Sequence, residues 1–522
     1  MSGRKVDKGL ITSPDERIMM TMGSSVQIHS AHNSALSLWQ SAVHSVLLQQ
    51  GVSNGHQGIG ATASSPAMLA TGEIIRQYDN NGNFEVPAVQ SSQASEAATS
   101  TGEAALAAPR SASVECANLA AQIAFYRAIN PAKAAELKNI FAASTCDPFW
   151  AECLAVYERF RISGAQQRYD RYASIDDYVL NDCLSDNATI AVIGDWGTGM
   201  NAALVLLQQI ADHFQPDVLL HLGDIYYSGL PAECSNHFSK LLEEVWPDIG
   251  EKSAPLVFTL DGNHDRYAGT SGGYYDLIAS LNKSANKPQP NSYFAIRNNF
   301  WQFLALDTGF YDCDPNNVNS NVTKLVPEEV AWHLDKIKNN GEGVNAAVNP
   351  SGVRRTVLLS HHQLFSFTGV GKDPATGRPL AINPNLVSGF SSVFDSIDLW
   401  LWGHEHDLCI FQPYANGPDQ PLPRGRCIGA SAVPVFTSQA PKAPVNLLLP
   451  NGASGPPKII DGTALGNDGQ VFNRCYAIIS LRGGALSIDY YQANTTNATP
   501  GNPPKLADPL FSETIPGMLA AS

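Results

Sequence analysis

The chain has 522 residues, and its hydrophobic fraction of 44% is ample for a sizeable globular core. A formal net charge of -15 argues against a general nucleic-acid binder, because such a protein normally carries a basic face. No stretch reaches the roughly 18 uninterrupted apolar residues of a membrane helix, so we expect no membrane partner.

The cysteines and the N-terminus bear on the cellular compartment. The nine cysteines are scattered, odd in number and free of any CxxC pair, which favours reduced thiols in the cytoplasm. The first residues reach the charges of Asp15, Glu16 and Arg17 before any apolar core, unlike a secretory signal. Secretion stays open as an alternative, since a gene product can carry a leader that its mature chain lacks.

The N-terminal third is predicted to be an extension of two parts. Residues 1–110 are partly of low complexity, and one stretch, 34–51, has apolar residues at helical spacing. Residues 111–184 are predicted to be helical, because Pro131 and Pro148 each follow a capping side chain, as prolines at the first helical position do. The sequence assigns no function to this third.

From residue 185 onward, strands and helices alternate. This order is typical of an α/β domain with a largely parallel sheet. Antiparallel pairing enters late, because the apolar runs within 475–493 are joined at Gly483 and Gly484. We expect one domain over 185–495 and a C-terminal tail over 496–522. The other predicted elements are helices over 201–214, 237–249 and 327–341 and strands over 292–297, 300–308 and 355–361.

Five apolar runs in this domain each end in an acid, an amide or an imidazole and then break into a turn. Polar side chains at the strand ends of an α/β sheet converge on the crevice where such folds place their ligands. Each residue alone has a plainer explanation, because Asp and Asn are common in turns and a lone His is often a core residue. Together they favour a shared metal site. The segments are AVIGDWG (191–197), LLHLGDIYY (219–227), VFTLDGNHD (257–265), VLLSHH (357–362) and LWLWGHEHD (400–407).

The residue types suit two cations. Asp195 and Asp224 supply hard oxygen donors, and one carboxylate can bridge two ions. His404 and His406 are separated by one residue, so on an extended chain both can point the same way, each toward its own metal. Two ions in one crevice usually indicate hydrolysis of a phosphate ester.

These motifs match a family. GDWG at 194–197, GDxxY at 223–227, GNHD at 262–265, the strand ending in His361 and GHxH at 403–406 resemble the calcineurin-like metallophosphoesterases. Trp196 in the first motif and Tyr227 in the second resemble the purple acid phosphatase branch. The resemblance covers about residues 188–490 and implies a four-layer α/β/β/α sandwich with the metals at the strand ends.

The resemblance also implies a ligand set. Asp195, Tyr227 and His406 would bind the first metal, Asn263, His361 and His404 the second, and Asp224 would bridge the two. Fe(III) suits the tyrosinate site, and Fe(II), Zn(II) or Mn(II) suits the other. His264 would contact the phosphate or protonate the leaving oxygen and would be oriented by Asp265.

The expected activity is hydrolysis of phosphate monoesters, with a metal-bound hydroxide attacking phosphorus in line and a small molecule or a protein as substrate. Phosphodiester hydrolysis on the same centre is the main alternative. Two other hypotheses are weaker: a nucleotide-binding glycine loop at 194–199 leaves four motifs unexplained, and a ligand-depleted scaffold would lack donors.

The sequence departs from the family's motifs at two places. Gly197 occupies a position where many relatives have His, and the sequence HHQL leaves the role of His362 open.

Overall fold

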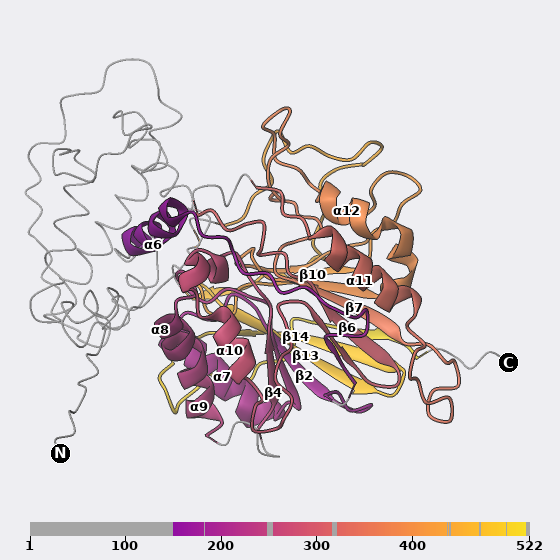
Figure 1. Cartoon of the computed structure of the whole chain (residues 1–522), viewed down its shortest axis with the longest axis horizontal. Helices are drawn as coiled ribbons and strands as arrows, with labels where there is room; N and C mark the ends of the chain where they lie inside the picture. Colours follow the sequence, from indigo (N-terminus) through magenta and orange to yellow (C-terminus); the bar gives the residue numbers. More distant parts are fainter. Residues whose placement is uncertain are drawn as a thin grey trace, which may run out of the picture. The chain divides into compact units, whose positions relative to one another are not determined.

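The computed structural model describes residues 150–517, apart from 182, 248–253, 316–320, 436, 438–439, 469–470 and 497. The predicted helix over 34–51, the helix after Pro131 and the extension over 1–110 lie outside the described residues. The chain enters the described part through helix α6 (Trp150–Ser163), which falls within the predicted helical region (Figure 1).

A six-stranded sheet is built around the first βαβαβ unit. Strands β2 (Thr189–Ile193), β3 (Val218–His221) and β4 (Leu256–Thr259) run parallel, as predicted. The late hairpin adds antiparallel pairs and completes the order β15-β14-β13-β2-β3-β4. The three later strands are β13 (Arg474–Arg482), β14 (Ala485–Ala493) and β15 (Phe511–Ile515).

A second sheet has seven strands in the order β1-β5-β6-β7-β8-β10-β9. The central strands β6, β7, β8 and β10 run parallel, whereas β5 pairs antiparallel with β6 and β9 pairs antiparallel with β10. The strands are β1 (Val179–Leu180), β5 (Phe294–Arg297), β6 (Trp301–Ala305), β7 (Arg355–Ser360), β8 (Leu399–Trp402), β9 (Leu408–Ile410) and β10 (Gly425–Ile428).

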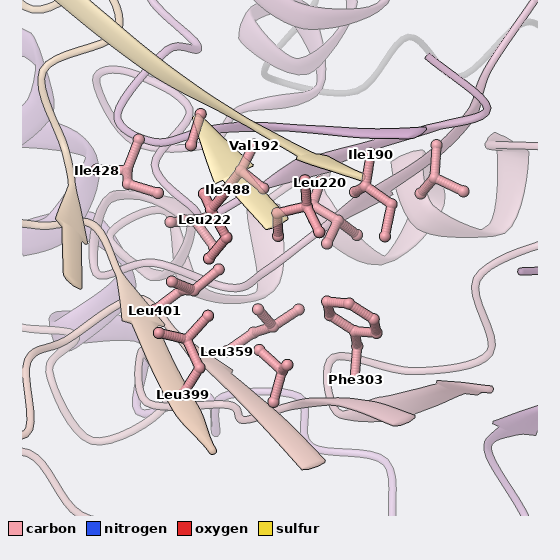
Figure 2. Close-up of a cluster of buried hydrophobic side chains, with 14 of the residues drawn as sticks. Ile190, Val192, Leu220, Leu222, Phe303, Leu359, Leu399, Leu401, Ile428 and Ile488 are labelled. Atoms are coloured by element: carbon pink, nitrogen blue, oxygen red, sulfur yellow. The ribbon is translucent and has the colours of Figure 1, made fainter. Parts of the chain in front are cut away.

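The two sheets pack face to face over an apolar core. Side chains alternate between the two faces of a strand. In β2, Ile190 and Val192 therefore belong to the core between the sheets, whereas Ala191 and Ile193 face the helices on the outer side. Figure 2 shows Ile190 and Val192 on one side of this core and Leu401 on the other. A close-packed apolar layer of this kind holds both sheets in fixed relation.

Helices cover the outer face of each sheet. On the six-stranded sheet, α7 (Asn201–Phe214) and α9 (Lys240–Val245) pack against the outward residues of β2 and β3. On the seven-stranded sheet, α11 (Pro327–Lys338) and α12 (Pro384–Phe390) do the same (Figure 1). The predicted α/β/β/α sandwich is therefore confirmed. Shorter helical elements lie at Pro231–Glu233 (α8), Cys234–Ser239, His264–Arg266, Gly269–Ser271, Tyr274–Ser280 (α10) and Ser391–Ser396, and a two-stranded ribbon joins Asn467–Asp468 (β11) to Val471–Phe472 (β12).

Two paired strands lie outside the predicted domain bounds of 185–495. Strand β1 pairs parallel with β5, and β15 pairs antiparallel with β14. The sheets therefore begin within the region predicted to be helical and end within the predicted tail. In the described part of the chain, no helix is long and apolar enough to cross a membrane.

Candidate metal centre

The candidate donors come from the carboxyl ends of parallel strands in both sheets. In the six-stranded sheet, Asp195, Asp224 and Asn263 follow β2, β3 and β4. In the seven-stranded sheet, His361 follows β7, and the pair His404 and His406 follows β8. The structure brings these six side chains together, because the packed sheets present the same ends at one edge.

The first group of donors surrounds a tyrosine hydroxyl. The hydroxyl oxygen of Tyr226 lies 2.9 Å from Oδ1 of Asp195, 3.2 Å from Oδ2 of Asp224 and 3.2 Å from Nε2 of His406. Nε2 of His406 is also 3.2 Å from Oδ1 of Asp195. Two carboxylates, an imidazole and a phenol thus face one small volume.

The second group centres on the amide of Asn263. Its Oδ1 lies 3.0 Å from Nε2 of His361 and 3.0 Å from Nδ1 of His404. The two imidazole nitrogens are 3.2 Å apart, and Nε2 of His361 lies 3.3 Å from Oδ1 of Asp224. Asp224 therefore points one oxygen at each group, which is the arrangement of a bridging carboxylate.

Close backbone packing and strained dihedrals hold the donors in place. Asp195, Asp224 and His404 have φ of +54°, +76° and +65°, a region that residues other than glycine seldom adopt and that clusters at functional sites. A Cβ at Gly403 would lie 2.6 Å from Oδ2 of Asp195, and one at Gly262 would collide with Oδ1 of Asp224. These glycines therefore let the backbone approach the carboxylates.

Hydrogen bonds behind the donors fix their orientation. Nδ1 of His361 contacts the carbonyl oxygen of Leu222 at 2.8 Å; a carbonyl only accepts, so this nitrogen carries a proton and Nε2 faces the site. The main-chain N–H of His404 donates to Oδ2 of Asp195 at 2.8 Å, which links the two sheets across the site. Such outer contacts fix the ring orientation of a metal-binding imidazole.

The charges of the site balance only in part. Burial opposes ionisation of Asp224, but the imidazoles of His361 and His264 hold the pKa of this carboxyl well below its usual range. Burial and the two carboxylates Asp195 and Asp224 raise the pKa of Tyr226 well above its usual value. Among the described residues, the ion-pair partners of these carboxylates are histidines and not Lys or Arg. Buried carboxylates without a fixed cation suit metal ions.

The structure brings the hydroxyl of Tyr226, the neighbour of the predicted ligand Tyr227, to the first group. Tyr227 contributes main-chain contacts: its N–H donates to Oε1 of Glu233 at 2.6 Å, and its carbonyl oxygen contacts Nδ1 of His264 at 2.6 Å. Glu233 also accepts from the N–H groups of Ser228 and Leu230, so this buried carboxylate fixes the turn after Asp224. The sequence motif alone did not reveal that Tyr226 faces the donors.

His264 lies beside the carboxylate of Asp224, with its Nε2 3.9 Å from Oδ2. Burial lowers the pKa of His264 to about 4. The prediction that Asp265 orients this imidazole is wrong, because the Tyr227 carbonyl makes that contact. Asp265 instead accepts from the main-chain N–H groups of Asp224, Ile225 and Gly262, and so ties the second motif to the third.

His362, whose role the sequence left open, is held from both sides. Its Nδ1 lies 3.0 Å from Oγ1 of Thr308, and its Nε2 lies 3.0 Å from Oδ2 of Asp312. Its ring packs against the ring of His404 with centroids 4.4 Å apart. His362 therefore supports a donor, through partners on a loop that no motif marked.

Comparison with known proteins identifies this region. Residues 188–408 match the model of the calcineurin-like phosphoesterase family. The chain contains a calcineurin-like phosphoesterase domain. This domain contains all the residues predicted as metal ligands, and its family typically binds a dinuclear metal centre.

Individual relatives are distant. No curated protein matches the chain. Among solved structures, GAP50 of the Plasmodium inner membrane complex is 12% identical, with 59% of this chain and 84% of that chain covered and a TM-score of 0.35. PhoD is 13% identical, with 65% and 73% covered and a TM-score of 0.39. Vps29 from Chaetomium thermophilum is 12% identical, with 64% and 100% covered and a TM-score of 0.24. The family match, and not these similarities, identifies the domain.

Proposed function

We propose that this calcineurin-like phosphoesterase is a dinuclear metal-dependent hydrolase of phosphate monoesters, similar to the purple acid phosphatases. One observation carries the proposal: the carboxylate of Asp224 points Oδ2 at the Tyr226 group and Oδ1 at the group around Asn263. Two cations held there would lower the pKa of water and neutralise charge on a phosphoryl group. The substrate would be a small molecule or a protein that carries a phosphoester.

The donors would divide between the two cations as the geometry groups them. Asp195, His406 and a tyrosine would hold the first, and Asn263, His361 and His404 would hold the second. The first group's two carboxylates and phenol are hard donors that favour Fe(III), whereas two imidazoles and an amide favour Fe(II), Zn(II) or Mn(II). We assign the phenol to Tyr226 because its hydroxyl contacts three of these donors; the motif resemblance alone assigned it to Tyr227.

His264 is the proposed substrate-side residue of the centre. Its Nδ1 bonds to the Tyr227 carbonyl, so the proton of the neutral ring stays on Nδ1 and Nε2 is the atom that can deliver or accept a second proton. Nε2 lies at the Asp224 carboxylate, next to the position that a phosphoester bound between the two groups would occupy. In this role His264 would contact the phosphate or protonate the leaving oxygen.

The test compares initial rates for an aryl phosphate monoester and the matching diester, using full-length protein of known metal content. We expect a clear preference for the monoester. A preference for the diester would contradict the substrate class and favour the alternative, a phosphodiesterase on the same centre. If protein that holds two ions per chain hydrolyses neither substrate, the proposal that it hydrolyses simple phosphoesters is contradicted.

The cytoplasm is the proposed compartment. The described thiols of Cys234, Cys409, Cys427 and Cys475 are free and buried, which suits a reducing environment. Fractionation of cells that express the tagged protein tests this location, and recovery in the culture medium would contradict it.

A further inference from the structure

The amide of Asn263 has one end that can bind a cation and one that cannot. Its oxygen faces His361 and His404, each at 3.0 Å, whereas its nitrogen donates to the hydroxyl of Tyr267 at 2.5 Å. A half-turn of the amide would exchange the two ends and aim an NH₂ group, which has only donor hydrogens, at the centre. Whatever fixes this amide therefore decides whether Asn263 is a ligand.

Tyr267 is built into the same turn as the ligand. It lies four residues after Asn263, at the end of the short helical turn His264–Arg266, and its side chain is fully buried. Its ring packs against the ring of His264 with centroids 4.7 Å apart. Within the described part of the chain, the Tyr267 hydroxyl is the acceptor that the Asn263 nitrogen contacts. A buried amide nitrogen needs such a partner, because an unmade buried hydrogen bond is costly.

We propose that Tyr267 is a positioning residue that holds the amide of Asn263 with its oxygen toward the second cation. The inference rests on the proposed function, since it assumes that a cation binds beside Asn263. Tyr267 itself touches neither cation nor substrate and acts through the amide.

The experiment uses two full-length variants and metal-free protein. Tyr267→Phe removes the hydroxyl and keeps the ring on His264. Tyr274→Phe is the matched control, because Tyr274 is also buried and its hydroxyl donates to the Thr259 carbonyl at 2.9 Å, away from the donors. Titration with Zn(II), followed calorimetrically, gives the two dissociation constants of each protein, and thermal unfolding of the metal-free proteins reports any general damage.

We expect Tyr267→Phe to lower the affinity for one of the two Zn(II) ions by about 10- to 100-fold, which is the usual effect of losing the hydrogen-bond partner of a metal ligand. The affinity for the other ion should not change. The control should bind both ions as the wild type does. Activity of Tyr267→Phe should return as the Zn(II) concentration is raised. Wild-type affinity for both ions in Tyr267→Phe, or equal weakening of both, would overturn the assignment.

A second variant separates positioning from packing. Asp at position 263 presents an oxygen in either orientation, so the hydroxyl of Tyr267 should matter little for Zn(II) affinity in an Asn263→Asp background. A loss of the same size in Asn263→Asp as in the wild type would show that Tyr267 acts through the fold alone and overturn the inference. Failure of the proposed function is distinguishable, because the wild type itself would then bind fewer than two Zn(II) ions.

Discussion

Two adjacent tyrosines follow Asp224, and the course of the backbone determines which hydroxyl reaches the candidate donors. Asp224 adopts φ of +76°, so strand alternation no longer applies beyond β3. The Tyr226 hydroxyl lies within 3.2 Å of Asp224 and His406, while the turn that contains Tyr227 is tied to Glu233. Paired substitutions can therefore assign the phenol donor.

Tyr226→Phe should bleach any visible colour of the Fe(III)-loaded protein, because it removes the phenolate from the first group. Tyr226→Phe should also lower the affinity for Fe(III) at the first group by at least about 10-fold. Tyr227→Phe should keep the colour. Visible absorption spectra and iron content of both variants check this expectation. Loss of colour in Tyr227→Phe, with colour retained in Tyr226→Phe, would show that Tyr227, the tyrosine of the GDxxY motif, is the ligand.

For single residues, the sequence predicts which residue types form the site better than it predicts where their side chains point. Asp195, Asp224 and Asn263 end predictable strands, and so their convergence could be anticipated from the fold type. Tyr226 and Tyr267 could not be assigned, because their roles depend on the course of short turns. The prediction that Asp265 orients His264 fails for the same reason, because a contact with the main-chain carbonyl of Tyr227 cannot be recognised from residue types.

Among the elements, the last strand is joined to the opposite sheet by a buried ion pair. Glu513 of β15 accepts from Arg426 of β10 at 2.7 and 2.8 Å, and the Tyr490 hydroxyl of β14 donates to the same carboxylate at 2.8 Å. Both charged side chains are at most 10% exposed. Removing one partner of a buried pair leaves the other charge uncompensated, which is strongly destabilising.

Glu513→Gln should lower the free energy of unfolding by about 3–5 kcal/mol at neutral pH. Burial opposes ionisation, but Arg426 and Tyr490 lower the pKa of Glu513 below its ordinary value. The stabilisation is therefore fully present above the unfolded pKa of about 4.3 and is lost as the pH falls through the lower folded pKa. Urea unfolding across this range should show the deficit of the variant shrinking in acid.

The matched control for this pair is Glu328→Gln. Glu328 pairs with Arg171 at 2.5 Å, but both side chains are more than half exposed, so its loss should cost at most about 1 kcal/mol. An equal effect of the two substitutions, or a deficit of Glu513→Gln that grows in acid, would contradict the role assigned to the buried pair.

Strong periodicity made some elements predictable and its absence hid others. Helix α7 spans the predicted 201–214 because its apolar residues recur at helical spacing over its whole length. Strand β1 has two residues, and β15 is an edge strand with three consecutive polar residues, Ser512 to Thr514. Their pairing depends on sheets formed elsewhere in the chain, and so their own sequence pattern does not mark them as strands.

For the whole molecule, the described sheets and all the proposed ligands fall between residues 179 and 515. Deleting residues 1–110 should therefore leave hydrolysis largely unchanged. Rates and metal content of the shortened and full-length proteins, compared at equal concentration, check this. Complete loss of soluble, active protein would show that the N-terminal extension is required for the fold or the centre.

We propose that Asp224 joins two cations in one hydrolytic centre, and the decisive measurement is metal analysis of Asp224→Asn alongside the wild type. We predict two ions per chain and phosphatase activity in the wild type. In Asp224→Asn we predict fewer than two ions and at least about a 100-fold loss of rate. Near-normal turnover in Asp224→Asn, or full wild-type activity with a single ion per chain, would show that Asp224 does not join two cations.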